Sequence, residues 1–167
     1  ASVAFTRHLG ARNPSIVYKG INADWWRRPD NFISKKDFFC IAFVGRLVYA
    51  KGVQDLLSAV ALFRGEFPLL LVSIIGDGPH RTVLEARVRA LGIAHIVIFH
   101  GALDAHEIRN ILWQADVLIN PSHSEGLPRS VLEAAAVGLP IIATDIGGTG
   151  EIIKNGVEGI LIPVHDA

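Results

Sequence analysis

The sequence predicts an α/β fold class, a doubly wound parallel sheet of about six strands with helices on both faces. Short apolar runs rich in Val and Ile alternate with longer segments of helical period, and Gly, Asp or Pro stand at the joints. The apolar runs show no polar–apolar alternation, which indicates strands covered on both faces, as parallel strands are. Together these observations predict repeated β-α units wound into one open sheet.

The expected strands are the short apolar runs at residues 40–44, 69–75, 96–99, 117–120, 140–143 and 159–162. The expected helices lie near residues 52–64, 80–91, 104–115 and 128–137, with a short helix at 149–154. Residues 1–38 contain one short strand, SIVYK, and then polar, Pro-containing sequence without a sustained period. We therefore assign residues 1–38 to an interdomain linker or lead-in and residues 39–167 to one domain.

The composition excludes several classes of partner. Of the 167 residues half are apolar, and 16 Lys and Arg balance 16 Asp and Glu, so no overall charge draws the chain to nucleic acid or acidic lipid. No apolar run reaches the roughly 18 residues that span a bilayer. The lone Cys40, in the run FFCIAFV, is expected to be a buried, unreactive thiol, which fits a reducing cytosolic setting. A start at Ala1 with no Met anywhere suggests a piece of a longer protein.

Ligands of open α/β sheets bind beyond the carboxyl ends of the strands, so the loops there are the candidate sites. Arg46 stands at the exit of the first strand, and Lys51 where the next helix is expected to begin. A cation in a first helical turn is opposed by the helix dipole at roughly 0.3–1 kcal/mol, and such violations are typical of functional sites. The two cations would suit a dianion such as a pyrophosphate. The alternative is a pair of solvated surface cations.

Glycines mark three further loops at this edge. Gly76 opens the sequence GDGP after the second strand, His100 and Gly101 follow the third, and three glycines occur within residues 144–151. Each loop could bring bare backbone against a ligand, for His100 and Gly101 a planar base, or could be only a turn. Because no G-x-G-x-x-G follows the first strand, a dinucleotide oxidoreductase is disfavoured.

The loop after the fourth strand, HSEGLP, places Glu125 just before an expected helix. Glu125 is expected to point into the cleft. Backbone N–H groups around the helix start, including those of Gly126 and Leu127, would form a second anion site.

Glu133 lies inside that helix, eight positions after Glu125. Helical spacing predicts that Leu132, Ala135 and Ala136 pack on the sheet, with Glu133 at the border of this face. Two interpretations of Glu133 stay open. It could bind a ligand, or it could form a surface ion pair with Arg129 worth a few tenths of a kcal/mol.

Taken in order, GRLVYAKG, GDGP and SEGLPRSVLEAAAVGLPIIATDIGGTGEII resemble the donor-binding domain of retaining glycosyltransferases of the GT-B fold, often called family 4 or group 1. The resemblance covers about residues 40–163, and its most specific element is the E-x7-E spacing with the LEAAAVGLPIIATDIGG continuation. The lead-in IVYKGINADWW also resembles that family's interdomain passage, with Lys19 in place of the usual Asn. EGLP and LEAAA replace the common EGFG and LEAMA and leave both acids in place. The resemblance implies a Rossmann-like domain that is one half of a GT-B enzyme.

The resemblance implies catalytic and donor-binding roles for Arg46, Lys51 and Glu125. Arg46 and Lys51 would bind the donor's pyrophosphate and stabilise the charge on the leaving nucleoside diphosphate, while Glu125 would reach hydroxyls of the donor sugar. Glu133 would accept hydrogen bonds from both ribose hydroxyls, and Glu151 would help to order the glycine loop. The other expected donor-binding residues are Gly76, His100, Gly101, Ala102, Gly126 and Leu127.

The implied activity is transfer of a hexose from a nucleoside-diphosphate sugar, with UDP or GDP as the nucleotide, to an acceptor with retention of configuration. Neither D-x-D nor a zinc spacing of His and Cys is present, and the family needs no metal, so no cofactor and no metal site are expected. Expected partners are the nucleotide-sugar donor, an N-terminal acceptor domain of the full-length chain, and a saccharide or lipid-linked saccharide acceptor, with no nucleic acid.

The full-length enzyme is expected in the cytoplasm, with peripheral binding to the inner face of the membrane as a further option. The acceptor domain is expected to be missing from this chain, which would then be inactive alone. Two alternatives stay open: a non-catalytic nucleotide-binding module, and a GT-B phosphorylase, synthase or epimerase.

Overall fold

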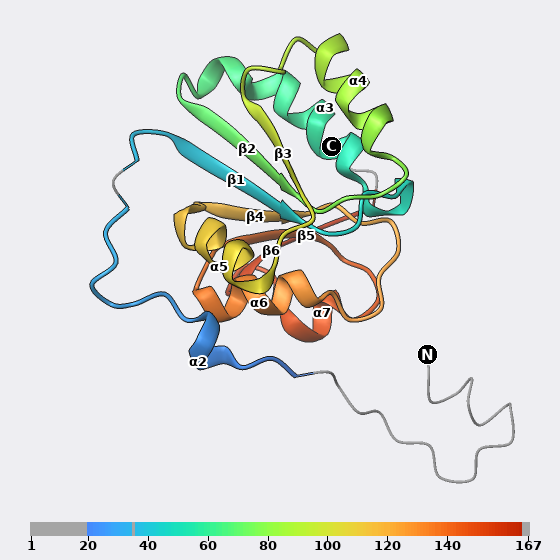
Figure 1. Ribbon diagram of the computed structural model, residues 1–167. Coiled ribbons are helices and arrows are strands. Elements are labelled where there is room, and N and C mark those ends of the chain that lie inside the picture. Colours follow the sequence, from blue (N-terminus) through green and yellow to red (C-terminus); the bar gives the residue numbers. More distant parts are fainter. Residues whose placement is uncertain (1–19, 35, 165–167) are drawn as a thin grey trace, which may run out of the picture.

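The computed structural model describes residues 20–34 and 36–164, which form an open parallel sheet with helices on both faces (Figure 1). The strand order is β3-β2-β1-β4-β5-β6. The strands are β1 (Phe39–Val44), β2 (Leu70–Ile75), β3 (Val97–Gly101), β4 (Val117–Asn120), β5 (Ile141–Thr144) and β6 (Gly159–Ile162). The order reverses between β1 and β4, which is the topological switch point of a Rossmann-like sheet. The predicted fold class is therefore confirmed.

Two helical layers cover the sheet. In Figure 1, α3 (Val53–Phe63) and α4 (Arg81–Ala90) lie on one side of it. On the other side lie α5 (Ala105–Gln114), α6 (Arg129–Val137) and α7 (Thr149–Ile152). Two separate clusters of buried apolar side chains correspond to these layers, one beneath α3 and α4 and one beneath α5 and α6.

The strands and longer helices begin and end within two residues of the predicted limits. Continuous burial along β1 and β2, with no alternation between faces, confirms that both faces of these strands are covered. Three short elements were not predicted: α2 (Ala23–Trp26) and the 3-10 turns at Tyr49–Lys51 and Arg64–Glu66. Each spans only one turn, so it leaves no helical period in the sequence.

The buried face of α6 differs from the predicted one. The prediction placed Leu132, Ala135 and Ala136 against the sheet. The residues of α6 that are buried are Val131, Glu133, Ala134 and Val137, and Ala135 is exposed. The segment VLEAAAV is apolar at almost every position, so several stripes of helical spacing fit it equally well. Packing against α2, α5 and the sheet decides which stripe is buried.

The described part of the lead-in packs against the domain. Trp26 of α2 is 3% exposed, and its carbonyl oxygen accepts a hydrogen bond from Trp113 Nε1 at 2.9 Å. The Arg109 guanidinium lies over the rings of Trp25, at 4.2 Å, and Trp113, at 4.7 Å. The division at residues 38 and 39 stays a prediction, and the strand predicted at residues 15–19 lies outside the described residues.

Cys40 is 2% exposed, in agreement with its predicted burial, and desolvation raises the pKa of its thiol. Within the ranges 20–34 and 36–164, no helix combines the length and the apolar character needed to cross a membrane.

Candidate functional site

A cavity of about 570 Å³ lies at the switch point of the sheet. Its walls come from the end of β1 and the loop after it, the start of α5, the loop after β4, and the first turns of α6. The charged side chains that line it are Arg46, Lys51, Glu125, Arg129 and Glu133. The structure thus brings four of the predicted site residues to one cavity, together with Leu127, and adds Arg129.

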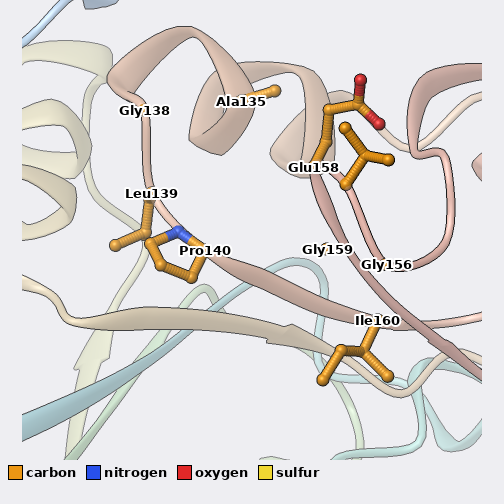
Figure 2. Close-up of a pocket in the computed structure, with 9 residues that line it drawn as sticks. Ala135, Gly138, Leu139, Pro140, Gly156, Glu158, Gly159 and Ile160 are labelled. Carbon is orange, nitrogen blue, oxygen red and sulfur yellow. The ribbon is translucent and has the colours of Figure 1, made fainter.

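A cavity of about 630 Å³ lies at the opposite, amino-terminal edge of β5 and β6, and Figure 2 shows the side chains around it. Leu139, Pro140 and Ile160 make much of its wall, and Glu158 is the one charged residue in its lining. None of the predicted site residues lines it. The cavity at the switch point is therefore the candidate site.

Lys51 and Glu125 form an ion pair in this site, with Lys51 Nζ 2.6 Å from Glu125 Oε1. The Ser122 hydroxyl donates to the same carboxylate oxygen at 2.7 Å. The Glu125 side chain is 8% exposed and that of Lys51 is 26% exposed. The loop after β1 and the loop after β4 are therefore joined at the cavity wall by a largely buried charge pair.

Lys51 does not lie in the first turn of α3, where the sequence placed it. It ends the 3-10 turn Tyr49–Lys51, and α3 begins two residues later. Gly52 separates them with a left-handed backbone, φ 65°, and a Cβ at this position would lie 1.9 Å from the Pro121 carbonyl oxygen. Asp55 occupies the first turn of α3, so the dipole of that helix is matched in the usual way.

Glu133 combines the two interpretations that the sequence left open. Arg129 Nε donates to Glu133 Oε1 at 2.7 Å, so the ion pair exists. The Glu133 side chain is only 8% exposed, however, and it lines the cavity. Desolvation raises the pKa of Glu133, and the neighbouring Arg129 opposes that shift. The pair is therefore a buried feature of the site and not a solvated surface contact.

The start of α6 also lines the cavity. Pro128 is its N-cap, no side chain caps the first turn, and that turn contains no acid. The first backbone N–H groups of a helix have no acceptor within it, so those of Arg129 and Ser130 are available to an anion. Sequence reasoning treated Arg129 only as the partner of Glu133. The signal that could have identified it is a cation at the first position of a helix, where the dipole opposes it.

The family model described as "Glycosyl transferases group 1" matches residues 26–167. The chain belongs to this family. It is 34% identical over 161 residues to the glycogen synthase of Mycobacterium tuberculosis, an alignment that covers 94% of this chain and 38% of that protein.

Two solved structures extend the comparison of the group 1 chain. The Anabaena protein HepE in complex with UDP-glucose has a TM-score of 0.82 at 23% identity, covering 98% of this chain and 48% of that one. The pneumococcal O-GlcNAc transferase GtfA in complex with UDP and GlcNAc has a TM-score of 0.68 at 28% identity, covering 75% of this chain and 24% of that one. The group 1 chain therefore spans less than half the length of each of these relatives.

The glycine loop of the group 1 chain packs against the loop that carries Glu125. Gly147 has φ 54°, and a Cβ there would lie 2.2 Å from the Glu125 carbonyl oxygen. Gly148 N donates to the Gly126 carbonyl oxygen at 2.6 Å. The absence of side chains thus allows two loops to meet, which the sequence did not predict. Glu151 is exposed on α7, and its role in ordering the loop stays a prediction.

The residues predicted to contact a base lie apart from the cavity lining. Gly76 N donates to the Gly101 carbonyl oxygen at 2.8 Å, which joins the ends of β2 and β3. The His100 ring lies 3.2 Å from Ser73 Oγ, and burial lowers the pKa of His100, which favours the neutral ring. Neither Gly76 nor the segment from His100 to Ala102 lines the cavity at the switch point. Their contact with a base stays a prediction.

In the part of the group 1 chain that the structure describes, no group of three or more His, Cys, Asp or Glu side chains could hold a metal ion. The expectation that the activity needs no metal stays a prediction.

Proposed function

We propose that this chain is the donor-binding half of a retaining glycosyltransferase that transfers a hexose from a nucleoside-diphosphate sugar. The observation that carries the proposal is the cavity at the switch point, where Arg46, Lys51, Glu125 and Glu133 meet beside the uncapped start of α6. Cations and free backbone N–H groups suit a diphosphate. Carboxylates suit the hydroxyls of a sugar and a ribose.

The chemistry follows from where charge develops. The bond between the anomeric carbon and the phosphate oxygen breaks, which leaves negative charge on the nucleoside diphosphate and oxocarbenium-like positive charge on the sugar. Fixed cations beside the departing phosphate lower this barrier, a role that we assign to Arg46 and Lys51. The acceptor hydroxyl then bonds to the anomeric carbon from the face that the phosphate leaves, which retains the configuration.

Glu125 is assigned to binding and orienting the donor sugar. Its Oε1 already accepts from both Lys51 and Ser122, which makes it a poor nucleophile and a well-oriented acceptor. Glu133, further along α6, is assigned to the ribose hydroxyls. Since the cations would supply the positive charge on the phosphate side, we also propose that no metal is essential.

The relatives support a nucleotide sugar as donor, because GtfA is solved with UDP and GlcNAc. Since the glycogen synthase and both solved relatives are more than twice as long as the matched region, we propose that an N-terminal domain of the full-length protein supplies the acceptor site. We expect the acceptor to be a saccharide or a lipid-linked saccharide. The 167 residues would then bind a nucleotide without transferring sugar.

Calorimetric titration with UDP, GDP and ADP tests the proposal. We expect one of them to bind, and Arg46→Ala and Glu133→Ala each to weaken that binding about tenfold or more, as loss of a hydrogen bond to a charged group does. Arg87→Ala is the matched control, because Arg87 lies outside the cavity and bonds to Gln54 and Ser58 of α3. If no nucleotide binds, or if both site variants bind like the control, the proposal is wrong.

Product analysis with the full-length protein separates transfer from the alternatives. A glycoside with retained configuration supports a transferase or synthase. Free sugar phosphate indicates a phosphorylase, and an altered sugar indicates an epimerase. Nucleotide binding with no product from any acceptor would indicate a non-catalytic module, and steady transfer by the isolated 167 residues would contradict the missing acceptor site.

A further inference from the structure

Two helices of this chain begin with the same ion pair. Arg129 is the first residue of α6, and its Nε donates to Glu133 Oε1 at 2.7 Å. Arg81 is the first residue of α4, and its Nε donates to Glu85 Oε1 at 2.8 Å. The spacing, the helix position and the bonded atoms are identical, so the surroundings alone distinguish the two pairs.

The surroundings of the two acids differ sharply. The Glu85 side chain is 35% exposed, whereas that of Glu133 is 8% exposed. The two arginines differ in the opposite sense, with 32% exposure for Arg81 and 57% for Arg129. A buried carboxylate therefore fixes one edge of the Arg129 guanidinium, while the rest of this cation stays accessible on the wall of the cavity.

The position of Arg129 is unfavourable for folding alone. The positive end of the α6 dipole opposes a cation at the first helical position, and this turn contains no compensating acid. A bound anion would relieve the conflict. In the first turn of α4, Asp77 gives Arg81 a second carboxylate partner at 3.1 Å. Within residues 20–34 and 36–164, Arg129 has only Glu133 as an ion-pair partner.

The charge of the cavity lining gives the same answer. Three cations, Arg46, Lys51 and Arg129, and two carboxylates, Glu125 and Glu133, line it, so one positive charge is in excess. Without Arg129 the lining would be neutral and would not favour a dianion. The bond to Glu133 uses Nε, which leaves the two terminal nitrogens of the guanidinium for a ligand. A guanidinium fork matches two phosphate oxygens in geometry.

We propose that Arg129 is a donor-binding residue that contacts the diphosphate of the nucleotide sugar together with Arg46 and Lys51. Because Arg129 stays bonded to Glu133, it also links the phosphate end of the donor to the carboxylate assigned to the ribose. This inference rests on the proposed function, since it requires a nucleoside diphosphate in the cavity.

A double-mutant cycle tests the inference by calorimetric titration of the full chain. The probes are the tightest binder among UDP, GDP and ADP, and the corresponding nucleoside. Arg129→Ala is measured in the parent and in the Glu133→Gln background. In both backgrounds we expect about tenfold weaker binding of the diphosphate, and in Glu133→Gln less than about a twofold change for the nucleoside. Arg129→Lys keeps the charge but not the fork, and should fall between parent and Arg129→Ala.

Arg81→Ala is the control, because it breaks the matching pair on α4 outside the cavity. It should leave the ratio of diphosphate to nucleoside affinity at the parent value. If the effect of Arg129→Ala disappears in Glu133→Gln, Arg129 acts only through Glu133 and the inference is wrong. Equal diphosphate binding by parent and Arg129→Ala would also overturn it while leaving the proposed function standing. A parent that binds no nucleotide would remove both.

Discussion

Lys51 and Glu125 lie 74 positions apart in the sequence, yet their charged groups are 2.6 Å apart across the switch point of the sheet. Lys51 follows β1 and Glu125 follows β4, and these two strands are neighbours. The pair thus fixes the distance between the cations after one strand and the acids after the other. Five consequences of this arrangement and of the surrounding fold can be measured.

Lys51→Ala should lower the free energy of unfolding by about 1–3 kcal/mol, because the Glu125 side chain, 8% exposed, loses its cation and keeps only Ser122 as a partner. Urea denaturation measures the loss. Lys154→Ala is the control, since its exposed position predicts a change within about 0.5 kcal/mol. Equal stability of the two variants would show that the ion pair contributes nothing to folding.

Glu133→Gln should change how stability depends on pH. Burial raises the pKa of Glu133 above its ordinary value of 4.5, so between these two values the folded chain binds more protons than the unfolded chain. This carboxyl therefore reduces stability as pH rises through that window. The stability of the variant relative to the parent should increase from acidic to neutral pH, measured by urea unfolding at several pH values.

The same measurement in an Arg129→Ala background supplies the control. Arg129 opposes the upward shift, so its removal should move the window for Glu133 to higher pH. A difference between Glu133→Gln and the parent that stays constant with pH would contradict the burial of a charged group at this position.

Gly147→Ala should destabilise the loop that carries Glu125 and weaken nucleotide binding. A Cβ at residue 147 would lie 2.2 Å from the Glu125 carbonyl oxygen, so one of the two loops must move. Gly156→Ala is matched, because Gly156 also has positive φ but no atom within 4 Å of the added Cβ. Backbone strain of about 1–2 kcal/mol is common to both variants. Only Gly147→Ala should lower stability further and lower nucleotide affinity, as measured by thermal unfolding and titration.

Trp26→Ala should cost about 3–5 kcal/mol of stability, because Trp26 is 3% exposed in the core beneath α5 and α6. Trp25→Ala should cost less, since Trp25 is only partly buried. Chemical denaturation of both variants tests whether the lead-in from residue 20 onward belongs to the folding unit. Unchanged stability of Trp26→Ala would support the predicted boundary at residue 38.

Cys40 should resist alkylation in the folded chain and react readily in urea. Its thiol is 2% exposed, and burial raises its pKa, so the reactive thiolate is scarce at neutral pH. Mass spectrometry after brief treatment with iodoacetamide measures the modified fraction. Rapid labelling without denaturant would mean that β1 opens at its amino-terminal end.

The strands and long helices could be predicted because each depends on a pattern within a few consecutive residues. Apolar runs of four to seven residues in this sequence became strands, and longer periodic segments between them became helices. The site was predictable to a similar extent. Parallel strands place their following loops at one edge, so Arg46, Lys51 and Glu125 were expected to lie together before their contacts were known.

Three features of the site required the tertiary structure. The buried stripe of α6 was predicted wrongly because nearly every position in VLEAAAV is apolar, and only the neighbouring α2 and α5 choose among the possible stripes. Lys51 was placed in α3 because the sequence does not show that Pro121 approaches Gly52 and ends the preceding 3-10 turn. Arg129 was assigned to the surface because burial of Glu133 cannot be read from a spacing of four residues.

Local sequence thus specifies which segments of this chain become strands and helices, and which loops share the carboxyl edge. Contacts between residues far apart in the chain decide which charges are paired there, such as Lys51 with Glu125, and which acid is buried. The physical reason is range. Backbone conformation responds mainly to nearby residues, whereas desolvation and ion pairing depend on every group that packing brings within a few ångström.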